Sequence, residues 1–202
     1  YRKGIDGYER NLSDAQKYGM ALAYMENNQA GTAETLLNGL AKSRPDNLWI
    51  SIAHAESAHA LGDSALARVR FEQLLTRFPN NRAVILAYAE SLLEQNEKAS
   101  ALRAQEILRT LSNDSAEDVV FQRSFARAFE LSGNTLRAAE SYAEVAYLNG
   151  RVDDAINQLS VLMKNDDLDY YQRARIEARI AELRPISLEL ERQGIRAEEQ
   201  GR

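Results

Sequence analysis

The stretch from Leu48 to Asn81, LWISIAHAESAHALGDSALARVRFEQLLTRFPNN, decides the fold of this chain. On each side of Gly62-Asp63 its apolar residues recur with the spacing of one helix face. Glycine followed by aspartate marks a turn. The stretch therefore predicts two amphipathic helices joined by a tight turn. Four of its residues stand nine, four and eight positions apart: Ala58, Ala67, Phe71 and Pro79.

The same spacing recurs upstream, in a second set of four residues: Tyr24, Ala33, Leu37 and Pro45. A unit of about 34 residues with a small or aromatic residue, then A-x3-F and then proline is the second half of the tetratricopeptide repeat (TPR) pattern. The two prolines, Pro45 and Pro79, are separated by the length of one such unit. The chain therefore resembles an array of TPR helix pairs.

The expected turns give the length of each repeat. Three turn residues, which tolerate a left-handed backbone, are each one TPR unit apart: Asn28, Gly62 and Asn96. Gly133 comes three positions later than this spacing requires, which predicts about three inserted residues near Lys98–Leu102. Gly150 then follows after only half a repeat. The helix expected over residues 136–149 should therefore close one repeat and open the next.

These patterns predict an all-α TPR superhelix of about eleven helices, in which stacking covers the apolar face of each pair. Residues 1–13 are expected to form a linker or lead-in helix, residues 14–165 the TPR array with its slip near 136–150, and residues 166–202 C-terminal helices with a frayed end. Pro185 should end or kink the long helix expected over Asp169–Arg184.

Close helix contacts are expected where small residues recur in the first helix of each pair. These small residues are Ala21, Ala55, Ala89 and Ala126, and the large residues that fill the space beyond them are Leu37, Phe71, Leu108 and Tyr142. Burying one such large side chain contributes roughly 1.5–3 kcal/mol. Most Leu, Ala and Tyr residues of this chain are therefore interpreted as core.

Composition excludes several classes of function. The net charge of −5 and the scattered 25 Lys and Arg residues argue against nucleic acid as a partner. No apolar run of about 18 residues is present, so no segment is expected to span a membrane. The absence of cysteine excludes disulfides and thiolate zinc sites. Because the chain begins at Tyr1 without Met, we expect it to be a piece of a longer protein.

The sequence contains no recognisable catalytic or metal-binding motif. H-E-x-x-H, the P-loop, G-x-S-x-G and G-x-G-x-x-G are all absent. His54 and His59 are five apart on one expected helix and point away from each other, so they make a poor metal pair. The acidic run at 165–169 lacks the glycine and glutamate of a calcium loop, and helix capping explains it better. We expect this segment to be non-catalytic and to hold no cofactor.

A TPR array binds proteins in a groove lined by the first helix of each pair, and resemblance to that family implies which residues face it. Those residues are Tyr18, Leu22, Met25, Trp49, Ile52, Glu56, His59, Leu86, Glu90, Leu93, Arg123, Arg127, Glu130, Glu140, Glu144 and Tyr147. The Lys and Asn residues with which chaperone-adaptor TPRs grip a C-terminal carboxylate have no counterpart here.

Two of these groove assignments have an alternative interpretation. Trp49 is the single tryptophan, a residue type enriched in binding hot spots, but it is equally well explained as a helix-packing residue. Arg123 and Arg127 share a helix face and are suited to an acidic segment. Glu130, three positions after Arg127, is equally suited to neutralising it.

Three irregular segments resemble a particular family. They are QKYGMAL at 16–22, LNGRVDDAINQL at 148–159 and QRARIEARIAELR at 172–184. Their order is similar to that of the C-terminal TPR half of the β-barrel assembly-enhancing proteases, bacterial periplasmic zinc metallopeptidases and chaperones. The resemblance implies a periplasmic domain whose partners are the β-barrel assembly machinery and outer-membrane protein clients. It also implies that zinc belongs to a protease domain that precedes this segment.

The alternative interpretation is a stand-alone TPR scaffold or adaptor in the cytoplasm or cell envelope. It would share every regular repeat feature and would differ in what precedes Tyr1.

Overall fold

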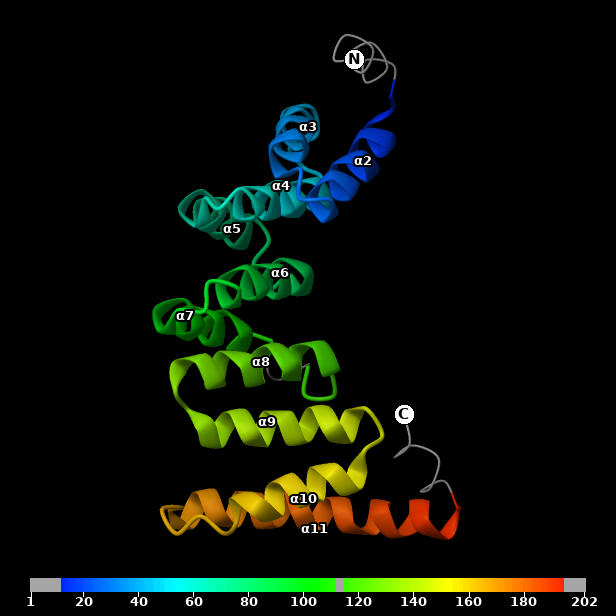
Figure 1. Cartoon of the computed structure of the whole chain (residues 1–202), viewed down its shortest axis with the longest axis vertical. Coiled ribbons are helices and arrows are strands. Elements are labelled where there is room, and N and C mark those ends of the chain that lie inside the picture. The colour runs from blue at the N-terminus through cyan, green and yellow to red at the C-terminus, as the bar shows by residue number, and fades with distance from the viewer. Residues whose placement is uncertain (1–11, 112–114, 195–202) are drawn as a thin grey trace. The chain divides into compact units, whose positions relative to one another are not determined.

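The computed structural model describes residues 12–111 and 115–194. Its helices are α2 (Asp14–Glu26), α3 (Ala30–Ser43), α4 (Leu48–Ala60), α5 (Ser64–Arg77), α6 (Arg82–Leu93), α7 (Lys98–Arg109), α8 (Val119–Ser132), α9 (Thr135–Leu148), α10 (Val152–Leu162) and α11 (Tyr170–Arg192). These ten helices are joined by turns, and the described ranges contain no strand (Figure 1). The predicted all-α class is confirmed, and residues 12–111 and 115–194 contain ten of the about eleven helices expected.

The chain forms two compact units, residues 1–91 and 92–202, and the boundary between them falls within the sequence of α6. Each unit has its own apolar core, described separately below. The predicted divisions after residues 13 and 165 stay predictions. Residues 1–11 and 195–202, expected to be the lead-in segment and the frayed end, lie outside the described ranges.

The turns follow the predicted register. All five predicted turn residues have a left-handed backbone: Asn28 (φ 56°), Gly62 (φ 82°), Asn96 (φ 53°), Gly133 (φ 89°) and Gly150 (φ 80°). Side-chain caps start the helices that follow most connections. Ser13 and Gln16 form a capping box at α2, and Asp169 and Gln172 form one at α11. Local sequence therefore fixes where most helices begin and end.

The predicted insertion near Lys98–Leu102 is wrong, because those residues lie inside the continuous helix α7. The starts of α5 and α7, at Ser64 and Lys98, are separated by one regular repeat. The starts of α6 and α8, at Arg82 and Val119, are separated by more than one repeat. The extra residues therefore lie in the connection between Arg109 and Val119.

This register also places Gln105, not Leu108, at the position of Phe71. Gln105 is 4% exposed, and its Nε2 donates to the Ala128 carbonyl (2.9 Å) and to Ser132 Oγ (2.6 Å). A buried amide thus replaces an apolar contact here, and its hydrogen bonds join α7 to α8.

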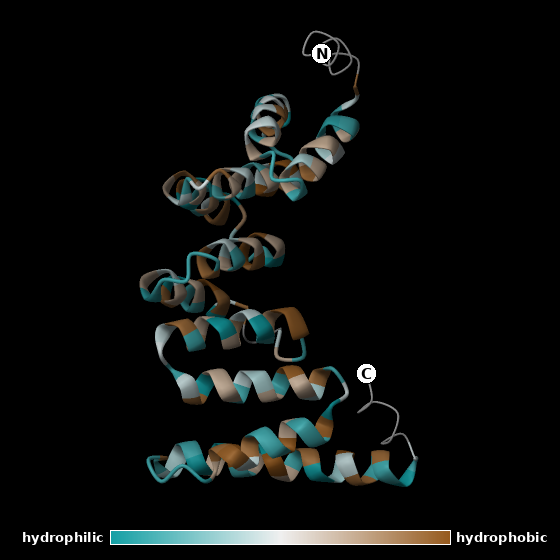
Figure 2. Cartoon of the chain, in the orientation of Figure 1, coloured by the Kyte–Doolittle hydropathy of each residue, from teal (hydrophilic) through white to brown (hydrophobic). Residues whose placement is uncertain are grey.

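Hydrophobic and hydrophilic residues alternate along each helix (Figure 2), and the buried ones form local clusters. In the first unit a cluster from α2, α3 and α4 comprises Ala21, Ala33, Leu37, Leu40, Ile50 and Ala53. Phe71 and Tyr88 stack in the same unit with ring centroids 5.0 Å apart. In the second unit a cluster from α9, α10 and α11 comprises Ala143, Ala146, Val152, Ala155, Leu159, Ile176, Ile180 and Leu183.

Helix α9 packs against a neighbour on each side, as its half-repeat spacing predicts. It lies between α8 and α10 and contacts both extensively (Figure 1). Ala138 and Ala143, which project from different sides of α9, are both buried, as are Val145 and Ala146. One helix therefore serves two helix pairs.

Pro185 does not end the long helix, contrary to the prediction that it would end or kink there. Helix α11 continues through it to Arg192. An interior proline costs about 3 kcal/mol, partly because the carbonyl four residues earlier loses its bond. That carbonyl belongs to Ala181, which is exposed to water. Beyond the proline, Ser187 is buried and donates to Asp153 Oδ1 (2.6 Å). Tertiary packing on α10 thus outweighs the local penalty.

An ion-pair cluster joins α3, α4 and α5. Arg70 donates to both Glu34 oxygens (2.7 and 2.9 Å), Ser57 Oγ donates to the same carboxylate (2.7 Å), and His54 Nε2 lies 3.3 Å from it. Burial alone would raise the pKa of Glu34, but the hydrogen bonds from Arg70 and Ser57 and the charge of Arg70 lower it to about 2. Burial, together with Arg70, lowers the pKa of His54.

We predict that Ala143→Glu destabilises the protein by roughly 3 kcal/mol, because it places a carboxylate in a close contact between α9 and its neighbours. Urea unfolding followed by circular dichroism measures the change. The exposed Ala178→Glu on α11 is the matched control and should stay within about 0.5 kcal/mol of the parent. An unchanged unfolding midpoint for Ala143→Glu would show that α9 is peripheral.

We predict that Glu34→Gln costs about 2 kcal/mol at neutral pH, after allowing for solvent screening of this partly exposed pair. The pKa of Glu34 is depressed in the folded state, so its contribution is complete above about pH 5 and is lost as pH falls toward 2. The unfolding free energies of parent and variant should therefore converge over that range, and a constant difference would contradict the assignment. Glu26→Gln, on an exposed residue of α2, is the control.

Candidate functional site

The predicted groove residues of the first unit divide into accessible and buried ones. Trp49 is 60% exposed and lines a cavity of about 360 Å³ together with Tyr18 and Ile50. Ile52, in contrast, is 6% exposed and belongs to the core. Its assignment to an accessible groove surface is therefore corrected. The half-buried members are Tyr18, Leu22, Met25, Glu56, His59 and Leu86, and Glu90 is exposed.

Burial raises the pKa of the Tyr18 phenol, and the nearby charge of Glu56 adds to the effect. The phenol therefore stays protonated at neutral pH and keeps its hydrogen-bond donor. Together with the exposed indole of Trp49, it gives the cavity of the first unit an aromatic lining with polar handles.

In the second unit the predicted groove residues are largely engaged with one another. Leu93 is 7% exposed, so its assignment to an accessible surface is also corrected. Arg127 pairs with Glu130 (3.2 Å) and donates to Asn96 Oδ1 (2.7 Å). The structure therefore contains the neutralising pair that the sequence left open. Arg123, one turn earlier, is exposed, and the half-buried Tyr147 ring lies under the guanidinium of Arg179, 4.8 Å from its centroid.

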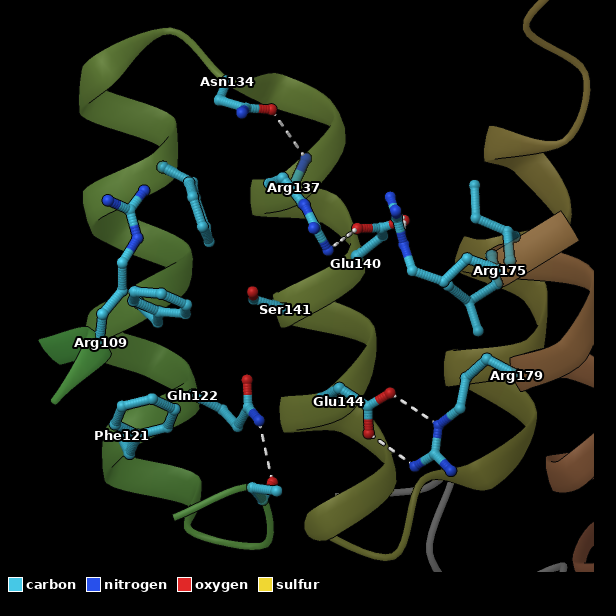
Figure 3. A pocket seen from close by; sticks show the side chains of 15 residues that line it. Arg109, Phe121, Gln122, Asn134, Arg137, Glu140, Ser141, Glu144, Arg175 and Arg179 are labelled. Atoms are coloured by element: carbon cyan, nitrogen blue, oxygen red, sulfur yellow. Dashed lines mark hydrogen bonds and ion pairs between the residues drawn. The ribbon is translucent and has the colours of Figure 1, made fainter. Parts of the chain in front are cut away.

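A larger pocket, of about 570 Å³, lies in this second unit (Figure 3). One wall is a row of three phenylalanines on α8, spaced four positions apart. Phe121 stacks on Phe125 (centroids 5.2 Å apart), and Phe125 contacts Phe129 (4.5 Å). Phe121 and Phe129 are buried, while Phe125 is half-buried. The spacing places these rings on one face of α8, and that face lines the pocket.

The opposite wall is charged and comes from α9 and α11. Glu140 accepts from Arg137 (3.2 Å) and from Arg175 (2.8 and 3.1 Å). One turn along α9, Glu144 is held by two hydrogen bonds from Arg179 (2.7 and 2.6 Å; Figure 3). Such paired donors from one guanidinium fix the geometry of a carboxylate.

The hydrogen bonds that Arg179 donates to Glu144 raise the pKa of Arg179, and those to Glu182 add to this against the effect of burial. Arg179 is therefore a permanent cation fixed between two carboxylates. Glu144 and Glu182 hold the guanidinium in place over the Tyr147 ring, so the orientation of Arg179 in the charged wall is fixed.

Two residues of this pocket, Glu140 and Glu144, were among the groove residues expected from the sequence. Glu140 follows Arg123, and Glu144 follows Arg127, by the same number of residues as Gly150 follows Gly133. This separation is half a repeat. Because α9 also opens a repeat, these glutamates occupy groove-type positions.

The cationic and aromatic residues of the pocket were missed. They are Arg175 and Arg179 on α11 and the phenylalanine row on α8. The signal that could have found the arginines is their spacing of four positions, which matches the spacing of Glu140 and Glu144.

No group of three or more His, Cys, Asp or Glu side chains suited to a metal ion occurs among residues 12–111 and 115–194. Within the same ranges, no helix is both long enough and apolar enough to span a bilayer.

Comparison with known proteins agrees with this architecture. Residues 53–81 match the tetratricopeptide repeat family model. The crystal structure of a thermophilic TPR protein from Thermus thermophilus superposes with a TM-score of 0.52 at 16% identity, covering 82% of this chain and 98% of that one. At that identity the likeness establishes the fold.

A relative in Vibrio cholerae is provisionally named a beta-barrel assembly-enhancing protease. It is 28% identical over 175 residues, which is 87% of this chain and 36% of the relative. The chain thus spans about a third of the length of that protein. Together these comparisons identify the chain as an all-α TPR fold, an architecture that serves protein–protein interaction.

Proposed function

We propose that this chain is the substrate- and partner-binding part of a periplasmic zinc metalloprotease and chaperone that acts in outer-membrane β-barrel protein assembly and quality control. The observation that supports the proposal most strongly is the 28% identity over 175 residues to a protein named as a beta-barrel assembly-enhancing protease. The three irregular segments quoted above supply the same resemblance independently of the regular repeats.

In this proposal the chain binds, and catalysis belongs to a different part of a longer protein. The chain covers 36% of the Vibrio relative, which leaves room there for a zinc protease domain. The partners would be components of the β-barrel assembly machinery and outer-membrane protein clients. The accessible groove residues that remain after the corrections above would supply the contacts, foremost Trp49 and Arg123.

Two kinds of contact would serve this binding. Trp49 offers a largely exposed indole, which buries much apolar area with little loss of conformational entropy. Arg123 offers a charge that steers an acidic partner and weakens with salt. Unfolded or partly folded client chains expose apolar side chains, so the aromatic contact should matter more than the charge.

Site-directed photocrosslinking in cells tests this proposal. A photoreactive phenylalanine analogue at Trp49 or Arg123 of the full-length protein should capture outer-membrane proteins or their assembly machinery. The same analogue at Arg68, which is exposed on the second helix of its pair, is the control and should capture them weakly. Crosslinks to cytoplasmic proteins alone would contradict the proposal and favour a stand-alone scaffold.

The proposal also assigns zinc to the longer protein and not to this chain. The purified 202-residue chain should therefore keep less than about 0.1 equivalent of zinc after dialysis and should not digest casein, because a zinc site needs three or four ligands. Metal analysis and a casein assay measure both. Zinc near one equivalent, or proteolysis that persists through further purification, would overturn this assignment.

A further inference from the structure

The pocket of the second unit carries more positive than negative charge. Its lining includes four arginines, Arg109, Arg137, Arg175 and Arg179, and two glutamates, Glu140 and Glu144. The excess is local, because the chain as a whole has a net charge of −5. An anionic group is therefore favoured at this pocket and disfavoured over the rest of the chain.

Part of this excess charge lies at Glu140, which two guanidiniums share. Glu140 is 14% exposed, whereas Arg137 and Arg175 are nearly half exposed. Arg137 donates to Glu140 through Nη1 alone, and Arg175 does so through Nε and Nη2. A guanidinium has five N–H donors, so both retain donors for a second carboxylate. Glu144 and Glu182, in contrast, already balance Arg179.

The aromatic wall lies on the other side of α9 from this charge. Figure 3 shows Phe121 of α8 on one side, Ser141 of α9 in the middle, and Arg175 and Arg179 of α11 on the other side. The lining of α9 runs from Asn134 to Glu144, which is about 15 Å at 1.5 Å per residue. Four to five residues of extended chain span about that length. A single small anion would leave the aromatic wall uncovered.

We infer that this pocket binds an extended internal peptide segment of about four to five residues that carries both an aspartate or glutamate and an aromatic side chain. The carboxylate pairs with Arg137 and Arg175, and the aromatic ring packs on Phe125. The inference rests on the proposed protein-binding function and names the chemical class of segment that is bound. The pocket volume of about 570 Å³ lies within the range of about 300–1,000 Å³ typical of ligand sites.

Fluorescence anisotropy with the purified 202-residue chain tests this inference. The probe is a fluorescein-labelled, C-terminally amidated peptide, Gly-Ser-Asp-Thr-Phe-Ser-Gly, measured at 50 mM and 500 mM NaCl. It should bind at least fivefold more tightly than the same peptide with Asn for Asp or with Ala for Phe. High salt should remove most of the preference for Asp, because the charges are partly exposed. Equal binding of the three peptides would overturn the inference.

Matched variants locate the binding. Arg175→Gln and Arg137→Gln should each weaken the Asp peptide at least fivefold and leave the Asn peptide unchanged. Phe125→Leu, which keeps the position apolar, should weaken both peptides that contain Phe. Arg184→Gln on the same helix, exposed and outside the pocket, is the control. An equal loss in Arg184→Gln would overturn the assignment to this pocket, and thermal unfolding checks that each variant is folded.

The carboxylate that binds could also be the C-terminus of a peptide. A peptide that lacks Asp and ends in Phe with a free carboxylate tests this second source. If it binds more tightly than the internal Asp peptide, the assignment to an internal segment is overturned. If the peptides do not bind, the proposed function is not refuted, because the crosslinking experiment identifies partners in cells through other residues, Trp49 and Arg123. Conversely, capture of cytoplasmic proteins alone would refute the proposed function without altering peptide binding in vitro.

Discussion

The structure depends on close contacts between helices at alanine. Ala33, Ala67 and Ala101 recur once in each repeat and are completely buried, and Ala138 holds the equivalent place after the insertion. A methyl group allows two helix backbones to approach, and the larger residue four positions later fills the space beyond. A larger side chain at any of these positions would force the helices apart.

Much of the fold was predictable because its determinants are local. Turn residues such as Gly62 and Gly133 have a left-handed backbone that few residue types adopt, so their spacing reveals the repeat length. This spacing shows that extra residues are inserted between Asn96 and Gly133, but it does not show where in that interval they lie. Helix α7 consists mostly of good helix formers and is continuous, so the insertion falls in the connection after it. Pro185 failed as a stop signal because Leu183 and Ser187 are held by α10, a contact that local sequence does not reveal.

The candidate site was less predictable, because it is made of contacts between helices. Of the groove positions that the family implies, Trp49 and Arg123 are exposed, whereas Ile52 and Leu93 are buried in the core. The apolar face of an amphipathic helix is about 100° wide. Residues at the edge of this face can be either exposed to solvent or buried by a neighbouring helix, and the sequence does not distinguish the two. The pocket of the second unit depends on arginines of α11 meeting glutamates of α9 that are distant in the sequence. They come together because α11 packs on α10, which in turn packs on α9.

The shared helix α9 affects both how this array unfolds locally and where it can gain or lose repeats in evolution. In an ordinary repeat array each unit contacts only its neighbours, so the ends can unfold or be deleted without affecting the rest. Because α9 completes the pair with α8 and also the pair with α10, losing it exposes two interfaces at once. The segment from α8 to α10 should therefore open in hydrogen exchange as one cooperative block. Gain or loss of a whole repeat is accommodated more easily before α8, where the chain retains interchangeable pairs.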